Sequence, residues 1–325
     1  MSRECFKDKN FNEGHMVIIM AANTILQEYD AAGYSLTLRQ LYYQFVARDE
    51  FPEGRKWSWN GRRWVKDVNG TKNAPPNYDW LGGIMNDARL AGLTDWKYIK
   101  DRTRSLKGWP FDQSPESAVD YAARTFDLDP WDSQPYRPEV WVEKEALAEV
   151  IEQAVKPWRV PFFSCRGYTS QSSQYEAGKR LRGHRYGGQI PIVFHLGDHD
   201  PSGCDMTRDN KDRLSMFADM GIRVERLALN MDQIQEYNPP PNPAKFTDSR
   251  CDAYVAEHGY SSWELDALTP DVMKSLIDDA LEGIVDREQF DMDRENVTKK
   301  REVLTAISHN YHDVVDFIKG LEGEE

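Results

Sequence analysis

The chain has 325 residues, of which 40% are hydrophobic and 29% are charged, so it can bury a sizeable core and is neither disordered nor collagen-like. Its net charge of −13, from 41 basic and 54 acidic residues, argues on its own against a protein that coats nucleic acid. Four cysteines without a CxxC pair, and an N-terminal apolar run (Met16 to Ala22) too short to cross a membrane, predict a cytoplasmic protein without a disulfide framework or a membrane segment.

The charge is distributed unevenly along the chain. Residues 1–135 carry 18 basic and 19 acidic side chains, and the stretch 39–107 carries 14 basic and 8 acidic ones. Almost all of the net negative charge therefore lies after Pro135. Pro135 itself belongs to a Pro- and Asp-rich segment (127–138) that is typical of a linker. We place a domain boundary there, which divides the chain into residues 1–135 and 136–325.

The first part is predicted to be mainly helical. Apolar residues at helical spacing predict helices over 12–31, 38–49 and 79–91, and a fourth short segment follows near 95–100. Thr37 stands where an N-cap residue would begin the second of these helices. Several short helices with a hairpin between them predict a winged-helix-like domain.

That hairpin is predicted from the segment RKWSWNGRRWVK, in which Asn60-Gly61 is a strong signal for a tight turn. Its basic side chains are expected to meet DNA phosphates, and its tryptophans either stack on bases or anchor the hairpin to the domain. The residues concerned are Lys56, Arg62, Arg63 and Lys66, and Trp57, Trp59 and Trp64. Arg102, Arg104 and Lys107 extend the same basic surface. We expect DNA binding that is modest, confined to one face, strongly salt-dependent and raised by Mg²⁺.

The second part alternates between strands and helices, which predicts an α/β domain with a parallel sheet covered by helices. The expected strands cover 139–142, 160–165, 191–196 and 222–229, and the helices between them cover 144–156, 172–182 and 204–219. Two further helices are expected at 270–283 and 294–320.

Carboxylates follow two of these strands. Glu143 ends the first strand, and Asp198 and Asp200 follow the third in the segment GDHDPSG. If the two strand ends are neighbours, the three carboxylates can hold Mg²⁺ for phosphodiester chemistry. The alternative is that they are solvated turn residues and helix N-caps. His199, between the two aspartates, is expected to point away from them.

The same residues resemble a known family. Glu143 with its strand and GDHDPSG resemble the Toprim domain of topoisomerases, primases and nucleases. More closely, WVEKEALAEVI, the pair Gly167-Tyr168 and the Asp-Pro-x-Gly that begins at Asp200 resemble the A subunit of topoisomerase VI and the meiotic double-strand-break transesterase. The run from Arg39 to Tyr43 (RQLYY) matches the segment in which that family carries its attacking tyrosine.

This resemblance implies a function and a set of site residues. It makes Tyr43 the nucleophile that attacks double-stranded DNA, and it makes Glu143, Asp198 and Asp200 the ligands of Mg²⁺. It also implies a 5′ phosphotyrosyl link and a homodimer in which the tyrosine and the metal of one site come from different protomers. The sequence contains no GxxxxGK[ST] phosphate loop, so strand passage would need a separate ATPase subunit of the B type.

The residues by themselves leave several assignments open. Neighbours on a helix lie about 100° apart, so Tyr42 is expected in the core and Tyr43 at the surface. Arg39, one turn before Tyr43, contacts either the scissile phosphate or a nearby carboxylate. Lys144 is either a phosphate contact or a surface residue at a helix start. Lys245 and Arg250 are possible DNA contacts.

Two rival functions therefore stand beside the tyrosine enzyme. One is a Toprim nuclease that uses metal-activated water, with Tyr43 structural. The other is a DNA-binding protein that keeps the fold without catalysis. The hairpin segment has no counterpart in the family pattern.

Overall fold

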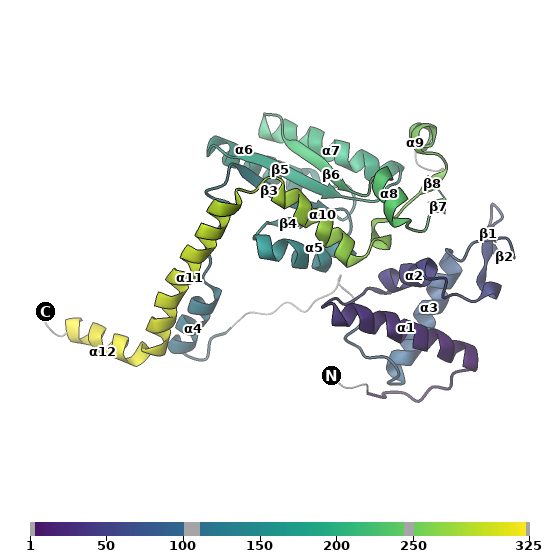
Figure 1. Cartoon of the computed structure of the whole chain (residues 1–325), viewed down its shortest axis with the longest axis horizontal. Coiled ribbons are helices and arrows are strands. Elements are labelled where there is room, and N and C mark those ends of the chain that lie inside the picture. The colour runs from purple at the N-terminus through teal and green to yellow at the C-terminus, as the bar shows by residue number, and fades with distance from the viewer. Residues whose placement is uncertain (1–3, 101–110, 244–249, 323–325) are drawn as a thin grey trace.

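The computed structural model describes residues 4–100, 111–243 and 250–322. Over these residues the chain is a mixed α/β protein with twelve α-helices and one four-stranded parallel sheet (Figure 1). The prediction of an α/β protein with a parallel sheet is confirmed. No helix among the described residues is long and apolar enough to span a membrane.

Three helices form the N-terminal part: α1 (Glu13–Ala31), α2 (Leu38–Ala47) and α3 (Pro75–Leu90). Thr37 is the N-cap of α2, as predicted, and forms a reciprocal capping box with Gln40. The third helix begins four residues earlier than predicted because prolines occupy its first turn, where their missing N–H and fixed φ are tolerated. The segment near 95–100 is not helical and instead pairs through Ile99 with Leu36.

A two-stranded hairpin, β1 (Trp57–Trp59) and β2 (Trp64–Lys66), lies between α2 and α3 in the chain and follows a short 3₁₀ turn, η1 (Glu53–Arg55). Trp59 is paired with Trp64, so the loop contains four residues rather than the tight two-residue turn that Asn60-Gly61 predicted. The Asn60 side chain accepts hydrogen bonds from two loop N–H groups and thereby closes this wider loop.

The sheet has the order β4-β3-β5-β6, with all strands parallel. Its members are β3 (Tyr136–Val142), β4 (Phe162–Ser164), β5 (Ile190–Leu196) and β6 (Arg223–Ala228). Helices α6 (Gln171–Tyr186) and α7 (Pro201–Ala218) pack together on one face of the sheet, and α5 (Ala148–Val155) packs on the other face with α10 (Pro270–Glu282). The helix predicted over 144–156 is divided into η2 (Glu145–Leu147), α5 and η3 (Lys156–Trp158).

The segments that follow β6 cover the edge of the sheet and extend away from it. They are α8 (Met231–Tyr237), β7 (Asn242–Pro243), α9 (Cys251–His258), β8 (Ser261–Ser262) and η4 (Leu265–Ala267). After α10, the single helix predicted at 294–320 is two helices, α11 (Arg287–His309) and α12 (Tyr311–Glu322), separated at Asn310. The pair β7 and β8 is antiparallel and lies beside the N-terminal part in Figure 1.

Residues on the N-terminal side of the predicted domain boundary contact the second part. Helix α4 (Pro115–Thr125) packs along α11, and the Arg301 guanidinium donates to the carbonyl of Phe126 at 2.6 Å. Trp131 is fully buried and packs against Phe290 in the core beneath the sheet. Residues 115–135 therefore lie against the sheet and its C-terminal helices (Figure 1).

Candidate active site

The carboxylates predicted to meet at the sheet edge are neighbours. Strands β3 and β5 are adjacent, with Val142 opposite Leu196, so the residues that follow them lie side by side. The Glu143 N–H donates to the carbonyl of Leu196 at 2.9 Å, and Glu143 Oε2 in turn accepts from the Asp198 N–H at 2.9 Å. The sheet topology therefore brings the first and third predicted strand ends together.

The two aspartates have different roles in the loop. Asp198 Oδ1 accepts from the N–H of Leu265 at 2.8 Å and lies 2.9 Å from Lys144 Nζ. Asp200 is the N-cap of α7, and its Oδ1 accepts from the Gly203 N–H at 2.7 Å. The N-cap alternative considered for Asp200 is thus present in the fold. Gly203 is required at its position, since a Cβ there would lie 2.2 Å from the carbonyl oxygen of Asp198.

Glu143 and Asp198 are buried carboxylates whose pKa values are raised. Burial and the neighbouring Asp198 raise the pKa of Glu143 to about 7. Burial also raises the pKa of Asp198, against the opposing effect of Lys144. Three carboxylates are hard oxygen donors of the kind that Mg²⁺ prefers, so the donor set fits that cation. Among the described residues, no group of three or more His, Cys, Asp or Glu side chains forms a ready-made metal cluster.

Lys144 lies at the centre of an ion-pair network that the sequence did not reveal. Its Nζ is 2.6 Å from Glu264 and 3.5 Å from Asp266, in addition to Asp198. Lys144 is therefore neither a surface residue nor free to meet a phosphate without breaking these pairs. No local pattern in the segment WELDA indicates this network, because Asp266 lies in the 3₁₀ turn η4 and reaches Lys144 only through the packing of segments far apart in the chain.

Arg39 joins the same network from helix α2. Its guanidinium pairs with Glu264 at 2.6 Å and with Asp266 at 3.4 Å. The carboxylate alternative for Arg39 is therefore the one seen in the structure. Because Glu264 contacts both Arg39 and Lys144, it connects the N-terminal helices to the carboxyl edge of the sheet.

Tyr43 is buried, which corrects the expectation that it faces solvent. Its exposed fraction is 3%, and that of Tyr42 is 5%. Helical spacing carries no information about what covers the far side of α2, and in the structure Glu264 and Asn242 of the second part cover that side. Burial and the charge of Glu264 raise the pKa of Tyr43 to about 12, although Arg39 and a hydrogen bond with Asn242 act in the opposite direction.

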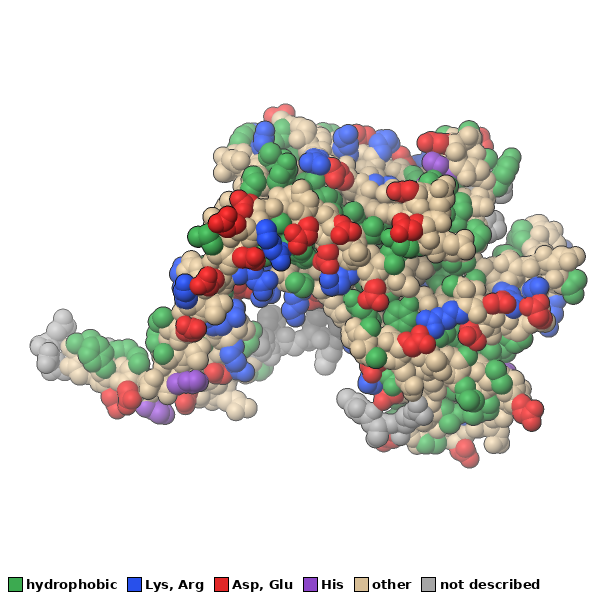
Figure 2. All heavy atoms as spheres, viewed as in Figure 1, with side chains coloured by type: hydrophobic (Ala, Val, Ile, Leu, Met, Phe, Trp, Pro, Cys, Tyr) green, Lys and Arg blue, Asp and Glu red, His purple; other side chains and the backbone are tan. Residues whose placement is uncertain are grey.

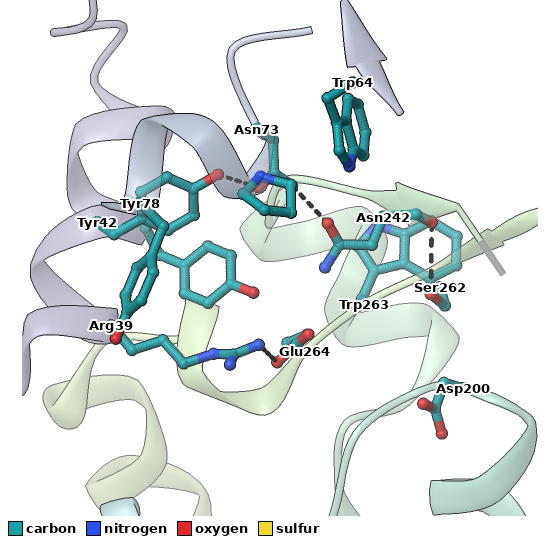
Figure 3. A pocket seen from close by; sticks show the side chains of 12 residues that line it. Arg39, Tyr42, Trp64, Asn73, Tyr78, Asp200, Asn242, Ser262, Trp263 and Glu264 are labelled. Atoms are coloured by element: carbon teal, nitrogen blue, oxygen red, sulfur yellow. Dashed lines mark hydrogen bonds and ion pairs between the residues drawn. The ribbon is translucent and has the colours of Figure 1, made fainter. Parts of the chain in front are cut away.

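Tyr42 occupies the core, as predicted. Its hydroxyl donates to Asn73 Oδ1 at 2.8 Å, and its ring packs edge-on against Tyr78. The Asn73 amide then donates to Asn242 Oδ1 at 2.8 Å, which links the hairpin side of the N-terminal part to β7 (Figure 3). Neither asparagine was identified from the sequence, because each depends on a contact between segments far apart in the chain.

A cavity of about 260 Å³ lies at this junction and contains the predicted nucleophile. Figure 3 shows Tyr42 and Arg39 on one side and Asp200 on the other. The lining residues are Arg39, Tyr42, Tyr43, Trp64, Asn73, Pro75, Tyr78, Asp200, Asn242, Ser262, Trp263 and Glu264. One chain therefore places Tyr43 and Asp200 around a single cavity, whereas the family resemblance implied a tyrosine and a metal from different protomers.

The basic hairpin is partly anchored and partly exposed. Trp57 donates its indole N–H to Asn77 at 2.9 Å, which matches the anchoring alternative, while Trp59 is 55% exposed and Trp64 lines the cavity. Lys56 pairs with Glu53 at 2.7 Å. Arg62 and Arg63 are exposed and form no ion pair with another described residue.

Of the remaining basic candidates, only Arg250 lies among the described residues. Arg102, Arg104, Lys107 and Lys245 lie outside the described residues, and Arg250 pairs with Asp205 at 2.8 Å. Figure 2 shows Lys and Arg side chains mixed with Asp and Glu over the visible face, rather than one continuous basic field.

His199 points away from the aspartates, as predicted. Its Nδ1 lies 2.8 Å from the hydroxyl of Tyr254, and its ring packs among those of Tyr254, His258 and Trp263. Burial lowers the pKa of His199 to about 4, so the ring is neutral at pH 7.

No protein-family model, curated protein or solved structure matches the chain.

Proposed function

We propose that this protein breaks a DNA phosphodiester bond by Mg²⁺-dependent transesterification, with Tyr43 as the nucleophile. The observation that carries the proposal is the single cavity lined by Tyr43, Arg39 and Asp200, beside the buried pair Glu143 and Asp198. A phenol, a guanidinium and clustered carboxylates are the groups that this reaction needs.

The proposed roles follow from these contacts. Glu143, Asp198 and Asp200 would hold Mg²⁺, which when bound would stabilise the negative charge that develops on the phosphate. Tyr43 Oη loses its proton and forms a bond to phosphorus, while the bond from phosphorus to O3′ breaks and O3′ takes up a proton. The product is a 5′ phosphotyrosyl link and a free 3′-hydroxyl. Arg39 favours the phenolate, and its guanidinium, which is 46% exposed, contacts the phosphate by exchanging part of its pairing with Glu264 and Asp266.

We also propose a family for each of the two parts of the chain. The three helices and hairpin support a winged-helix-like DNA-binding unit, and the parallel sheet with carboxylates after β3 and β5 supports a Toprim-like unit. Double-stranded DNA is the proposed partner, contacted by Arg62 and Arg63. A homodimer would place one such cavity on each strand of the DNA duplex. A separate ATPase subunit would be needed for the passage of one duplex through another.

One observation favours a second function. Tyr43 is 3% exposed and hydrogen-bonded, as a structural tyrosine would be. The alternative is a nuclease in which water attacks the phosphate at the same carboxylates.

The two functions are separated by a denaturing gel of the protein with end-labelled DNA and Mg²⁺. Tyrosine chemistry predicts a covalent protein–DNA band that is lost in Tyr43→Phe and kept in Tyr42→Phe, the matched control on the same helix. Cleavage that persists in Tyr43→Phe, without a covalent band, establishes the nuclease instead. If wild-type protein binds DNA but neither cuts it nor forms the band, and Asp198→Asn with Asp200→Asn changes nothing, the protein is a DNA-binding protein without catalysis.

A further inference from the structure

Aromatic side chains from distant segments surround the cavity that contains Tyr43. Tyr42, Tyr43 and Tyr78 come from α2 and α3, Trp64 comes from β2, and Trp263 follows β8. Figure 3 shows Tyr78 on one side of the cavity and the indoles of Trp64 and Trp263 on the other. Flat aromatic faces on opposite walls are the surroundings in which a planar ring system is bound by stacking.

The size of the cavity restricts what can enter it. The cavity has a volume of about 260 Å³. This is slightly below the range of about 300–1,000 Å³ that is typical of pockets for drug-sized ligands. The space suits one nucleobase and is too small for a base pair.

The position of Tyr43 restricts how DNA can reach it. With 3% of its surface exposed, Tyr43 cannot meet a phosphodiester that stays on the outside of a stacked duplex. A phosphate can meet this hydroxyl inside the cavity when its own nucleotide leaves the duplex stack and enters. Extruding a nucleotide costs a few kcal/mol in a paired duplex and least where the base is already unpaired.

We infer that the cavity takes one unpaired nucleotide of a DNA strand, with its base between Trp64, Trp263 and Tyr78 and its phosphate toward Arg39. Arg62 and Arg63 lie in the loop between β1 and β2, where they can contact the phosphates that flank the extruded nucleotide. The inference rests on the proposed function in naming DNA as the substrate, but binding of the base needs no cleavage. It defines the substrate as single-stranded DNA, or as duplex DNA with an unpaired nucleotide.

Binding without chemistry tests this inference. The probes are a perfect duplex, the same duplex with one bulged 2-aminopurine, the corresponding single strand, and a free nucleoside monophosphate, each titrated in EDTA. The bulged and single-stranded probes should bind at least about tenfold more tightly than the perfect duplex, with a change in 2-aminopurine fluorescence as the base enters the cavity. The free nucleotide should bind much more weakly, because it lacks the flanking phosphates.

Substitutions of Trp64, compared with a tryptophan outside the cavity, localise the effect. Trp64→Ala should lower affinity for the bulged probe by about 5- to 100-fold and leave perfect-duplex affinity unchanged, whereas Trp64→Phe should restore most of it. Trp96→Ala is the control, since Trp96 is an exposed tryptophan of the N-terminal part that does not line the cavity, and it should leave the ratio of bulged to duplex affinity unchanged. Circular dichroism and thermal melting establish that each variant is folded.

The outcomes separate this inference from the proposed function. Equal affinity for bulged and perfect duplex, or an equal loss for both in Trp64→Ala, overturns the inference. A covalent band that forms as fast on perfect duplex as on bulged duplex also overturns it while leaving Tyr43 the nucleophile. Preference for the bulge without any covalent band keeps the cavity as a base-binding site and removes the tyrosine chemistry.

Discussion

The ammonium group of Lys144 lies 2.9 Å from the carboxylate of Asp198, at the carboxyl edge of the sheet. The same ammonium contacts Glu264, which pairs with Arg39 on helix α2. A chain of charges therefore runs from the proposed metal ligands to the helix that carries the proposed nucleophile. Lys144 is mostly buried, and its pKa is raised by Asp198, Asp266 and Glu264 despite the opposing effect of burial, so it stays charged.

Removing the charge of Lys144 should destabilise the protein. Lys144→Met leaves the buried Asp198 without its ion-pair partner and leaves Glu264 and Asp266 with Arg39 alone, so the free energy of unfolding should fall by about 2–4 kcal/mol. Urea unfolding at pH 7 measures the change. Lys274→Met is the control, because Lys274 pairs with Asp278 on the exposed face of α10 and should cost less than about 1 kcal/mol. An equal small loss in both variants would mean that the network contributes little.

The loop that carries both aspartates is held by Arg226. Its guanidinium donates to the carbonyl oxygens of Gly197 at 3.0 Å, Asp198 at 2.5 Å, Gly203 at 2.9 Å and Leu229 at 3.2 Å. A lysine keeps the charge but cannot reach four acceptors in these directions.

We therefore expect Arg226→Lys to weaken Mg²⁺ binding by about 10- to 100-fold, as measured by isothermal titration calorimetry. The matched control is Arg223→Lys on the same strand, where Arg223 pairs near the surface with Glu225 and with no other residue of the described ranges. Unchanged Mg²⁺ affinity in Arg226→Lys would show that the loop keeps its shape without the guanidinium.

His195 should make stability depend on pH. It is fully buried on β5, and burial together with Arg226 lowers its pKa to about 3, whereas an unfolded histidine titrates near 6.5. The native state thus binds fewer protons than the unfolded state between these values. The stability that His195 contributes is complete above about pH 6.5 and is lost as the pH falls toward 3. At pH 5 the free energy of unfolding has fallen by about 2 kcal/mol on account of His195 alone.

The difference between wild type and His195→Gln isolates this contribution, because other groups titrate equally in both proteins. The difference in unfolding free energy should shrink by about 2 kcal/mol between pH 7 and pH 5. A difference that stays constant over this range would show that His195 is not buried as a neutral ring.

Arg62 and Arg63 should set the salt dependence of DNA binding. Each is exposed in the hairpin loop, and each phosphate contact contributes about −0.9 to the slope of log K against log salt concentration. Replacing either with alanine should reduce the slope by about 1, as measured by fluorescence anisotropy at several salt concentrations. Arg124→Ala, on α4 at the opposite end of the molecule, should leave the slope unchanged (Figure 1).

The sequence predicted the elements of the sheet well because parallel strands and their helices have strong local signals. It also predicted that Glu143 and Asp198 would meet, since carboxyl ends of neighbouring parallel strands share an edge. The hairpin was predicted with the wrong loop length, because Asn60 caps a four-residue loop rather than forming a two-residue turn.

The burial of Tyr43 could not be predicted from helix α2 alone. Its cover comes from Asn242 and Glu264, about two hundred residues later in the chain, and helical periodicity carries no information about such a contact. The same reason explains why Asp266 was missed. It is almost fully buried against Arg39 and Lys144, and only the packing of η4 on α2 brings it there.

The most direct test of the account is to identify the residue that becomes attached to DNA. Wild-type protein is incubated with Mg²⁺ and a bulged oligonucleotide, the DNA is digested, and the tryptic peptides are analysed by mass spectrometry. A tyrosine nucleophile at this site predicts a nucleotide joined through its 5′ phosphate to Tyr43, and no such adduct in Tyr43→Phe. Cleaved DNA with no modified peptide, or a nucleotide on a different residue, would contradict it.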